Sequence, residues 1–275
     1  MRVLFLLFFI IIFFDFSAQS QKSSNLDYKI TYDLTYKLDS TNLDDVKNEK
    51  FFLYRGGNSS MFASEGRILQ DSLKRKGTGS LDISERMERI RTNFKYVIYK
   101  GIPENKISYT YRIIRDNFRY EENLNQFAWE ILPETKLIKG FTAQKATTSY
   151  AGRDYEAWFT SEIPIPDGPY KFNGLPGLIL EVADSQDHYV FSFLELEKLK
   201  NISQLEFNTS ELIKTDKDKL GSLIKDYKLN PFAALERSNT PDKTITINFK
   251  EGQKEKLLKE AREQVARENN PIELN

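Results

Sequence analysis

Residues 129–182 hold the side chains whose types and spacing are best suited to chemistry, because charged residues there stand among aromatic ones. The set comprises Trp129, Glu134, Lys136, Lys145, Arg153, Trp158 and Glu162. In strands that face a core such charges need partners, since an unpaired buried charge is very costly. One interpretation is that Arg153 or Lys145 pairs with a glutamate, which would be Glu162 or Glu134. The pair would then line a cleft beside the two tryptophan rings.

Aromatic rings with a few placed charges make a suitable surface for a peptide or an acyl chain. The alternative is that the lysine and arginine heads reach water from the wet face of a sheet while their stems cover it. The residues themselves leave both interpretations open.

Most catalytic and metal chemistry is excluded by composition. The chain has no Cys and one His, which removes disulfides, thiol catalysis, thiolate zinc sites, iron–sulfur clusters and multi-histidine metal sites. His188 follows the polar run Ser185-Gln186-Asp187, which predicts a solvent-exposed turn, with a general base or a ligand as the alternative. We therefore expect no catalytic residue, no metal site and no cofactor.

The charge balance argues against nucleic acid as a partner. The 275 residues include 40 Lys+Arg and 40 Asp+Glu, for a formal net charge of +0. Nucleic-acid affinity depends on an excess of basic residues that neutralise phosphates, and this chain has no such excess.

A Gly/Pro-rich motif at residues 174–179 predicts a tight turn that leads into a strand. Its residues are Gly174, Leu175, Pro176, Gly177, Leu178 and Ile179. Pro176 and Gly177 suit the two central positions of a type II turn, because proline fixes φ near −65° and glycine accepts φ > 0. The apolar run 178–182 suits a buried strand. Such a turn lets a ligand or another backbone approach closely, although a plain hairpin corner explains it equally well.

The motif and its surroundings resemble the GLPGLI family of secreted proteins from Gram-negative envelopes. The matching blocks are Trp129-Glu130-Ile131, Glu134-Thr135-Lys136, Gly140-Phe141, Gln144-Lys145-Ala146, Gly152-Arg153, Ala157-Trp158-Phe159-Thr160, Glu162-Ile163-Pro164, Gly168-Pro169-Tyr170-Lys171-Phe172 and residues 174–179. Many members carry a Cys where this chain has Ala143, so the resemblance implies no thiol function here. The family is functionally uncharacterised, and the resemblance implies a secreted protein without an assigned activity.

The elements that must position these residues are mostly strands. Residues 28–38 alternate strictly between apolar or aromatic and polar side chains, as in a long strand with one buried face. The same alternation recurs near 94–98, 107–113 and 127–131. Short turns between such strands favour an antiparallel sheet. We therefore predict a mainly β (α+β) fold, with one curved antiparallel sheet or open half-barrel and a few peripheral helices.

Three helices and two loops are predicted around that sheet. The helices are expected from Asp82 to about Arg91, from about 213 to 227, and over the charged stretch 253–267. Residues 40–50 and 64–80 are polar or rich in Gly and Lys, which is typical of loops.

The first twenty residues are typical of a cleaved signal peptide. Arg2 precedes the apolar run 3–14, and Ala18-Gln19-Ser20 offers small residues for cleavage. The run is shorter than the roughly 20 apolar residues that span a bilayer, so no stable transmembrane anchor is expected after cleavage. We expect residues 21–275 to form a single β-rich domain that is periplasmic or secreted.

Three functions are compatible with these features. The first is a non-enzymatic protein that binds a hydrophobic, lipid or peptide ligand on the concave face of a curved sheet. The second is a structural or interaction module for an outer-membrane or secretion partner, acting through a sheet edge or the polar helix. The third is a hydrolase that uses carboxylates alone, with or without a bound divalent metal, which two buried carboxylates within about 10 Å of each other would favour.

Overall fold

The computed structural model of the protein describes residues 24–76, 90–200, 204–205, 212–239, 244 and 246–275. The predicted signal peptide lies outside the described residues, and so does nearly all of the helix predicted from Asp82. Both therefore stay predictions.

One open, mixed sheet of twelve strands dominates the described residues, with the order β14-β7-β6-β5-β4-β3-β2-β12-β11-β10-β9-β8. The strands are β1 (Ser24–Asn25), β2 (Tyr28–Tyr36), β3 (Lys47–Gly56), β4 (Ser59–Ser64), β5 (Tyr96–Lys100), β6 (Lys106–Ile113), β7 (Asp116–Asn123), β8 (Glu130–Ile138), β9 (Phe141–Tyr150), β10 (Arg153–Thr160), β11 (Leu178–Asp184), β12 (Tyr189–Lys198), β13 (Gln204–Leu205) and β14 (Leu212–Lys214). β1 and β13 form a separate pair. Neighbours in the large sheet run antiparallel apart from β14 and β7, which confirms the predicted fold class and adds one parallel pair.

Strand β2 lies near the centre of the sheet and confirms the alternation predicted for residues 28–38. Ile30, Tyr32, Leu34 and Tyr36 have exposed fractions of 0–1%. Burial of each such side chain stabilises the fold by about 1.5–3 kcal/mol. Two of the phenols are also satisfied, since the Tyr32 OH donates to the Ile179 carbonyl and the Tyr36 OH donates to Glu49.

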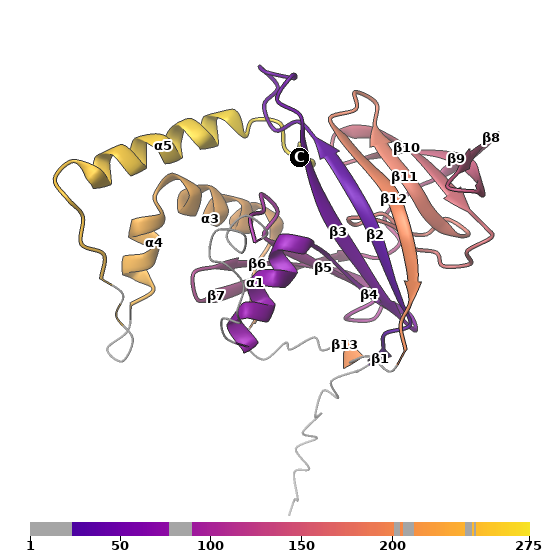
Figure 1. Ribbon diagram of the computed structural model, residues 1–275, viewed down its shortest axis with the longest axis horizontal. Coiled ribbons are helices and arrows are strands. Elements are labelled where there is room, and N and C mark those ends of the chain that lie inside the picture. Colours follow the sequence, from indigo (N-terminus) through magenta and orange to yellow (C-terminus); the bar gives the residue numbers. More distant parts are fainter. Residues whose placement is uncertain (1–23, 77–89, 201–203, 206–211, 240–243, 245) are drawn as a thin grey trace, which may run out of the picture.

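Four helices occur in the described residues, and Figure 1 shows them gathered at the β5–β7 end of the molecule. They are α1 (Glu65–Lys76), α3 (Lys217–Leu229), α4 (Pro231–Arg237) and α5 (Gln253–Arg267). α5 has the predicted bounds. α3 begins at Lys217 rather than near 213, because the Asp216 side chain caps it by accepting from the Lys219 amide at 2.7 Å. None of the helices described is long and apolar enough to cross a bilayer.

The two predicted loops are partly wrong. The stretch 64–80 contains helix α1, which begins where the Ser64 hydroxyl accepts from the Arg67 amide. Its polar residues find partners within the protein, since Arg67 pairs with Asp71 one turn later and also donates to the Lys95 carbonyl. The stretch 40–50 contains the start of β3. Its residues 47–50 pair with β2, beginning with Lys47 opposite Tyr36.

Residues 161–177, the crossing segment, leave the end of β10 and pass through the interior before β11 begins. Tyr170, Phe172 and Leu175 of this segment are at most 2% exposed. The Tyr170 ring packs on Tyr96 of β5 at 5.6 Å, and the Phe172 ring packs on Tyr155 of β10 at 4.8 Å. Because β5 and β10 lie in opposite halves of the sheet, the crossing segment joins the two halves.

Three prolines give the crossing segment its shape through successive γ-turns. The Ile165 amide donates to the Ile163 carbonyl, the Asp167 amide to Ile165, and the Gly177 amide to Leu175, at 2.7–2.8 Å. Each turn has proline at its centre, where the fixed φ near −65° is close to the value of an inverse γ-turn. The predicted type II turn at Pro176 is therefore wrong, because Leu178 donates to Ile163 instead of closing a four-residue turn.

Gly177 marks the closest backbone contact of this turn. It has φ +154°, and a Cβ placed on it would lie 2.0 Å from the Thr160 carbonyl oxygen. Because Gly177 has no side chain, the γ-turn packs directly against the end of β10. Strand β11 begins at the next residue, Leu178. The predicted strand at 178–182 is confirmed as part of β11.

Gly177→Ala is expected to destabilise the protein by about 3 kcal/mol, since the new methyl group overlaps a backbone oxygen that cannot move freely. Gly221→Ala in α3 is the matched control. Its Cβ meets nothing within 4 Å, so we expect a gain of about 0.5–1 kcal/mol from helix propensity. Urea unfolding followed by circular dichroism measures both, and equal effects would contradict the close approach at Gly177.

Candidate functional site

A buried ion triad anchors the crossing segment. Asp167, 1% exposed, contacts the Lys100 Nζ with one carboxylate oxygen and the Arg55 Nη1 with the other, the latter at 3.1 Å. The Lys100 ammonium also donates to the carbonyls of Gly168, at 2.6 Å, and Phe172, at 3.2 Å. Burial alone would raise the pKa of Asp167, but the Lys100 and Arg55 charges outweigh burial and hold that pKa below its ordinary value. The carboxylate therefore stays charged and fixes residues 167–172.

Residues 162–166, the part of the crossing segment that precedes Asp167, form one wall of an open cleft of about 780 Å³. The residues that line this cleft are Asp27, Tyr28, Arg55, Gly57, Lys139, Phe141, Glu162, Ile163, Pro164, Ile165, Pro166, Phe193, Leu194, Glu195 and Leu196. Two of the γ-turns described above stiffen residues 163–167, so this wall is preformed. A preformed, largely apolar cavity of roughly 300–1,000 Å³ is the usual form of a ligand site.

The opposite wall comes from a β-bulge in β12. Phe193 pairs with Tyr32 and Glu195 pairs with Thr31, so Leu194 is an extra residue in the strand. The bulge turns the local backbone and brings both Phe193 and Leu194 to the cleft. The Phe193 ring meets the Phe141 ring edge to face, with 6.2 Å between their centroids. This aromatic pair forms the apolar centre of the cleft.

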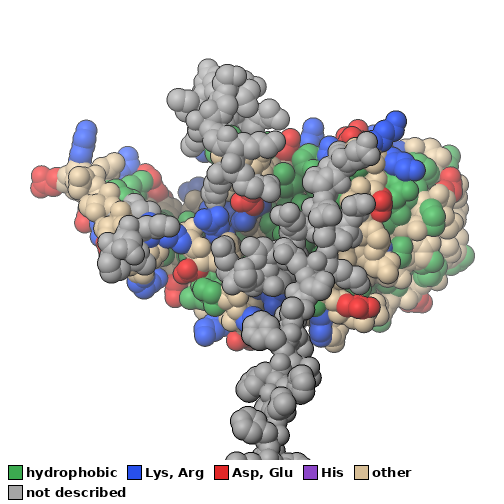
Figure 2. All heavy atoms as spheres, turned by 90° about the horizontal axis from the view of Figure 1, so that it is seen from below, with side chains coloured by type: hydrophobic (Ala, Val, Ile, Leu, Met, Phe, Trp, Pro, Cys, Tyr) green, Lys and Arg blue, Asp and Glu red, His purple; other side chains and the backbone are tan. Residues whose placement is uncertain are grey.

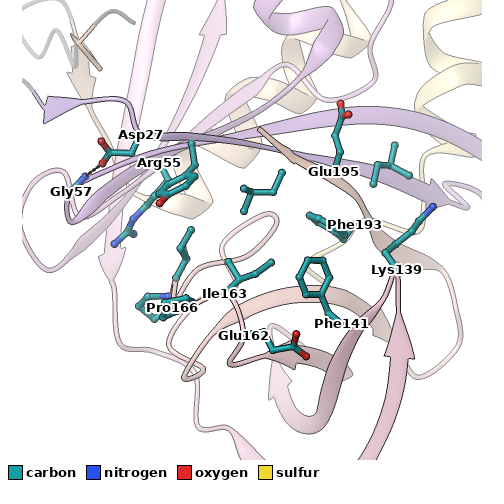
Figure 3. Close-up of a pocket in the computed structure, with 15 residues that line it drawn as sticks. Asp27, Arg55, Gly57, Lys139, Phe141, Glu162, Ile163, Pro166, Phe193 and Glu195 are labelled. Carbon is teal, nitrogen blue, oxygen red and sulfur yellow. Dashed lines mark hydrogen bonds between the residues drawn. The ribbon is translucent and has the colours of Figure 1, made fainter. Parts of the chain in front are cut away.

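A cation stands at each end of that centre, as Figure 3 shows: Lys139 at one end, and Arg55 beside Asp27 at the other. Lys139 belongs to the tight turn between β8 and β9, where Lys139 has φ +50° and Gly140 φ +89°. Two successive left-handed residues are typical of a type I′ hairpin turn, which projects the Lys139 side chain over the cleft. Arg55 is oriented by Asp167, so the buried triad also sets one end of the cleft.

The carboxylates of the cleft each accept a hydrogen bond from a neighbouring element. Glu162 accepts from the Thr142 amide at 2.7 Å, Asp27 from the Gly57 amide at 3.1 Å, and Glu195 from the Thr31 hydroxyl at 3.3 Å. They tie the cleft's walls to β9, to the turn between β3 and β4, and to β2. The site can therefore offer apolar contact along its centre and charges of both signs at its rim.

Of the residues that the sequence singled out, only Glu162 lines this cleft. Lys136, Lys145 and Trp158 come together elsewhere on the sheet. Lys136 pairs with Glu181 at 2.7 Å and lies 4.3 Å from the Trp158 ring centroid, while Lys145 pairs with Glu156 at 2.6 Å. This arrangement matches the alternative interpretation, in which the lysine ammonium groups stay partly exposed to water while the aliphatic parts of the side chains cover the sheet.

Arg153 is buried and pairs with Asp184 at 2.7 Å, so neither Glu134 nor Glu162 is its partner. His188 joins this pair, with 3.3 Å between its Nδ1 and the Arg153 Nη1. His188 is 8% exposed, so the predicted solvent-exposed turn is wrong at this position. The reason is its backbone, since the His188 carbonyl accepts from the Lys37 amide and draws the residue against β2.

Trp129 lies at a further place. Glu134 lies near Lys145, whose pKa is raised mainly by its hydrogen bond to Glu156 and in part by the Glu134 charge. Trp129 donates from Nε1 to the Asn173 carbonyl and stacks on Phe127, which makes it a support for the crossing segment. Glu134 is exposed on β8, the edge strand. The seven residues proposed from sequence therefore form no single cleft.

Sequence reasoning missed most of the cleft, including Arg55, Lys139, Phe141 and Phe193. A usable signal was present in the Pro164–Pro166 spacing, which predicts a stiff wall, and in the Lys139-Gly140 pair, which is typical of a tight turn. The bulge at Leu194 has no comparable signature in the sequence.

Comparison with protein families gives a match over residues 151–181 to a family described as a protein of unknown function (Porph_ging). The matched range holds β10, the crossing segment and the start of β11, including residues 174–179. No curated protein matches the chain.

Two solved structures of PNGF-II, in space groups C2 and P21, are similar to this protein. Their TM-scores are 0.51 and 0.52, with sequence identities of 16% and 17%. Each match covers 73% of this chain and 33% of PNGF-II, so the chain spans about a third of the length of the structures it matches. At such identities the likeness shows a shared fold.

Lys100→Met is expected to destabilise the protein by about 3–5 kcal/mol, because it leaves Asp167 buried without its nearest cation. Lys259→Met, which removes an exposed lysine paired at 3.9 Å on α5, serves as the control and should change stability little. Thermal and urea unfolding check this, and a Lys100→Met protein as stable as the control would show that the triad does not anchor the crossing segment.

Proposed function

We propose that this is an extracytoplasmic, non-enzymatic binding protein whose cleft holds an extended peptide segment. The observation that supports the proposal is the preformed cleft of about 780 Å³, with Phe141 and Phe193 at its centre and a cation at each end. The proposal takes the location from the signal peptide predicted at residues 1–20 and from the GLPGLI resemblance.

The rim charges support a peptide rather than an acyl chain. An acyl chain needs an apolar channel with a polar group at one end, whereas this cleft is lined by Arg55 and Lys139 together with three carboxylates along its length. A peptide offers amides, side chains and charges of both signs to such a rim, and apolar side chains to the two rings.

The hydrogen bonds of the cleft carboxylates support binding rather than hydrolysis. Each of Asp27, Glu162 and Glu195 accepts from the chain itself, which fixes the walls and leaves these groups less suited to moving protons. The likeness to one third of PNGF-II is compatible with a fold that serves as one module among others.

The exposed edge of the sheet favours a second candidate, an interaction module. Leu137 and Ile131 on β8 are 75% and 46% exposed, and Figure 2 shows apolar side chains on the surface of this half of the molecule. Two features limit pairing at this edge, because Pro133 lacks an amide and the Gln144 side chain already donates to the Leu132 carbonyl.

The test is selection from a random linear peptide library displayed on phage, followed by titration of the selected peptides. Phe141→Ala should weaken binding about tenfold or more, because it removes one ring of the central pair. Leu137→Ala is the matched control on the edge strand and should leave the affinity unchanged.

Three results would overturn the proposal: no enriched peptide, enriched peptides that bind Phe141→Ala as tightly as the unmodified protein, or binding lost in Leu137→Ala alone. The last result would favour the edge strand as the contact surface. Native mass spectrometry that finds a bound acyl chain would replace the peptide as the ligand class.

A further inference from the structure

Residues 269–274, the latch segment, follow α5 and contact Leu38 after β2, the turn between β9 and β10, and tyrosines of β10 and β12. Figure 1 shows the chain end beside these strands, and the site formed by these contacts is called the groove below. The backbone of the latch segment is held on both sides. The Asn270 amide donates to the Leu38 carbonyl at 2.9 Å, and the Leu274 amide to Ala151 at 2.8 Å. The hydroxyls of Tyr189 and Tyr155 donate to the carbonyls of Asn270, at 2.6 Å, and Ile272, at 2.9 Å. These contacts fit any extended chain.

The groove also recognises the asparagine of the segment. Arg153 donates from Nη2 to the Asn270 Oδ1 at 2.6 Å and to the Pro271 carbonyl at 2.7 Å. The Asn270 amide group donates to the Lys37 carbonyl at 2.7 Å. Asn270 is 5% exposed, so both ends of its side chain are satisfied within the protein.

A second side-chain site recognises the acid. Glu273 pairs with Lys171 at 2.5 Å and with Lys217 at 2.8 Å, and it accepts from the hydroxyls of Tyr150 and Tyr170. Burial alone would raise the pKa of Glu273, but the lysines and the hydrogen bonds outweigh it and lower that pKa, so the group stays charged. Lys171 has no exposed surface and is surrounded by four tyrosine rings. Lys171 also pairs with Glu122 at 2.7 Å, so Glu273 is the second anion of this site and the one that it shares with Lys217.

The helix that carries the latch segment does little to hold it. Along the whole of Gln253–Arg267 no residue is buried, and the helix packs mainly on α3. Two hollows of about 340 and 290 Å³ separate α5 from the sheet. A segment whose attachment depends on its own contacts can open as a local unit without unfolding the sheet.

We propose that the groove is a peptide-binding site for a partner protein, which presents an extended segment of the class Asn-Pro-apolar-acidic, and that residues 269–274 occupy it as a competitor in cis. The side-chain contacts set the class: Arg153 for the asparagine, buried Ile272 for the apolar position and the lysine pair for the acid. The partner is of another kind than a second copy of this chain. An identical segment in trans cannot displace one that is tethered at an effective concentration of about 1 mM, whereas a partner with further contacts can.

The probe is the fluorescent, acetylated and amidated heptapeptide Glu-Asn-Asn-Pro-Ile-Glu-Leu, which has the sequence of residues 268–274. Full-length Glu273→Lys places a third cation beside Lys171 and Lys217 and should expel its own segment. With an intrinsic Kd of about 10 µM, a cis competitor at about 1 mM weakens apparent binding about 100-fold. We therefore expect Glu273→Lys to bind the peptide about 100-fold more tightly than the unmodified protein, as measured by fluorescence polarisation.

Two controls accompany that measurement. Glu255→Lys makes the same charge change at an exposed position in the first turn of α5, away from the two hollows, and should behave as the unmodified protein. A peptide with Lys in place of its second Glu should not bind any variant, because the lysine pair repels it.

Hydrogen exchange of the unmodified protein decides the opening step even where Glu273→Lys does not fold. The amides of Asn270 and Leu274 should exchange faster than that of Tyr32 in β2. Equal protection of all three would overturn the proposal, and so would a folded Glu273→Lys protein that does not bind the peptide. A dimer of the unmodified protein that Glu273→Lys abolishes would instead make a second copy the occupant.

Discussion

A carboxylate buried between two cations is the interaction on which the rest of this structure depends. Asp167 could not remain in the interior alone, and Lys100 from β5 and Arg55 from β3 reach it from one half of the sheet. The segment that carries Asp167 comes from β10 in the other half. One ion triad thus joins the two halves of an open sheet that has no barrel closure to hold its shape.

The same triad couples the interior to the surface. Asp167 is the last residue of the stiff arm that walls the cleft, and its second oxygen orients Arg55 at the end of that cleft. Three residues further on, Tyr170 and then Lys171 reach the carboxylate of the latch segment. The crossing segment therefore contributes to two grooves, and its γ-turns at residues 163–167 keep the cleft preformed.

Much of the fold was predictable because it depends on local chemistry. The alternation at residues 28–38 specifies a strand whichever partner it finds, and the charged stretch 253–267 specifies a solvated helix. Two of the errors originate in hydrogen bonds between distant residues. His188 was expected at the surface but is drawn inward by Lys37, and Leu178, which would donate to Leu175 in the predicted turn, donates to Ile163 instead.

The sequence by itself determined the strand-rich fold class, the long central strand β2 and the solvated helix α5. It also determined that residues 174–177 form a stiff turn containing proline and glycine. Each of these follows from side-chain periodicity or from the backbone limits of proline and glycine. Only the tertiary structure decided which charges meet, because Arg153 and Asp184, or Lys171 and Glu273, are brought together by strand order and by a segment far along the chain. The spacing of residues along a chain shows the periodicity of a helix or strand, but it does not specify the register between strands that are distant in the sequence.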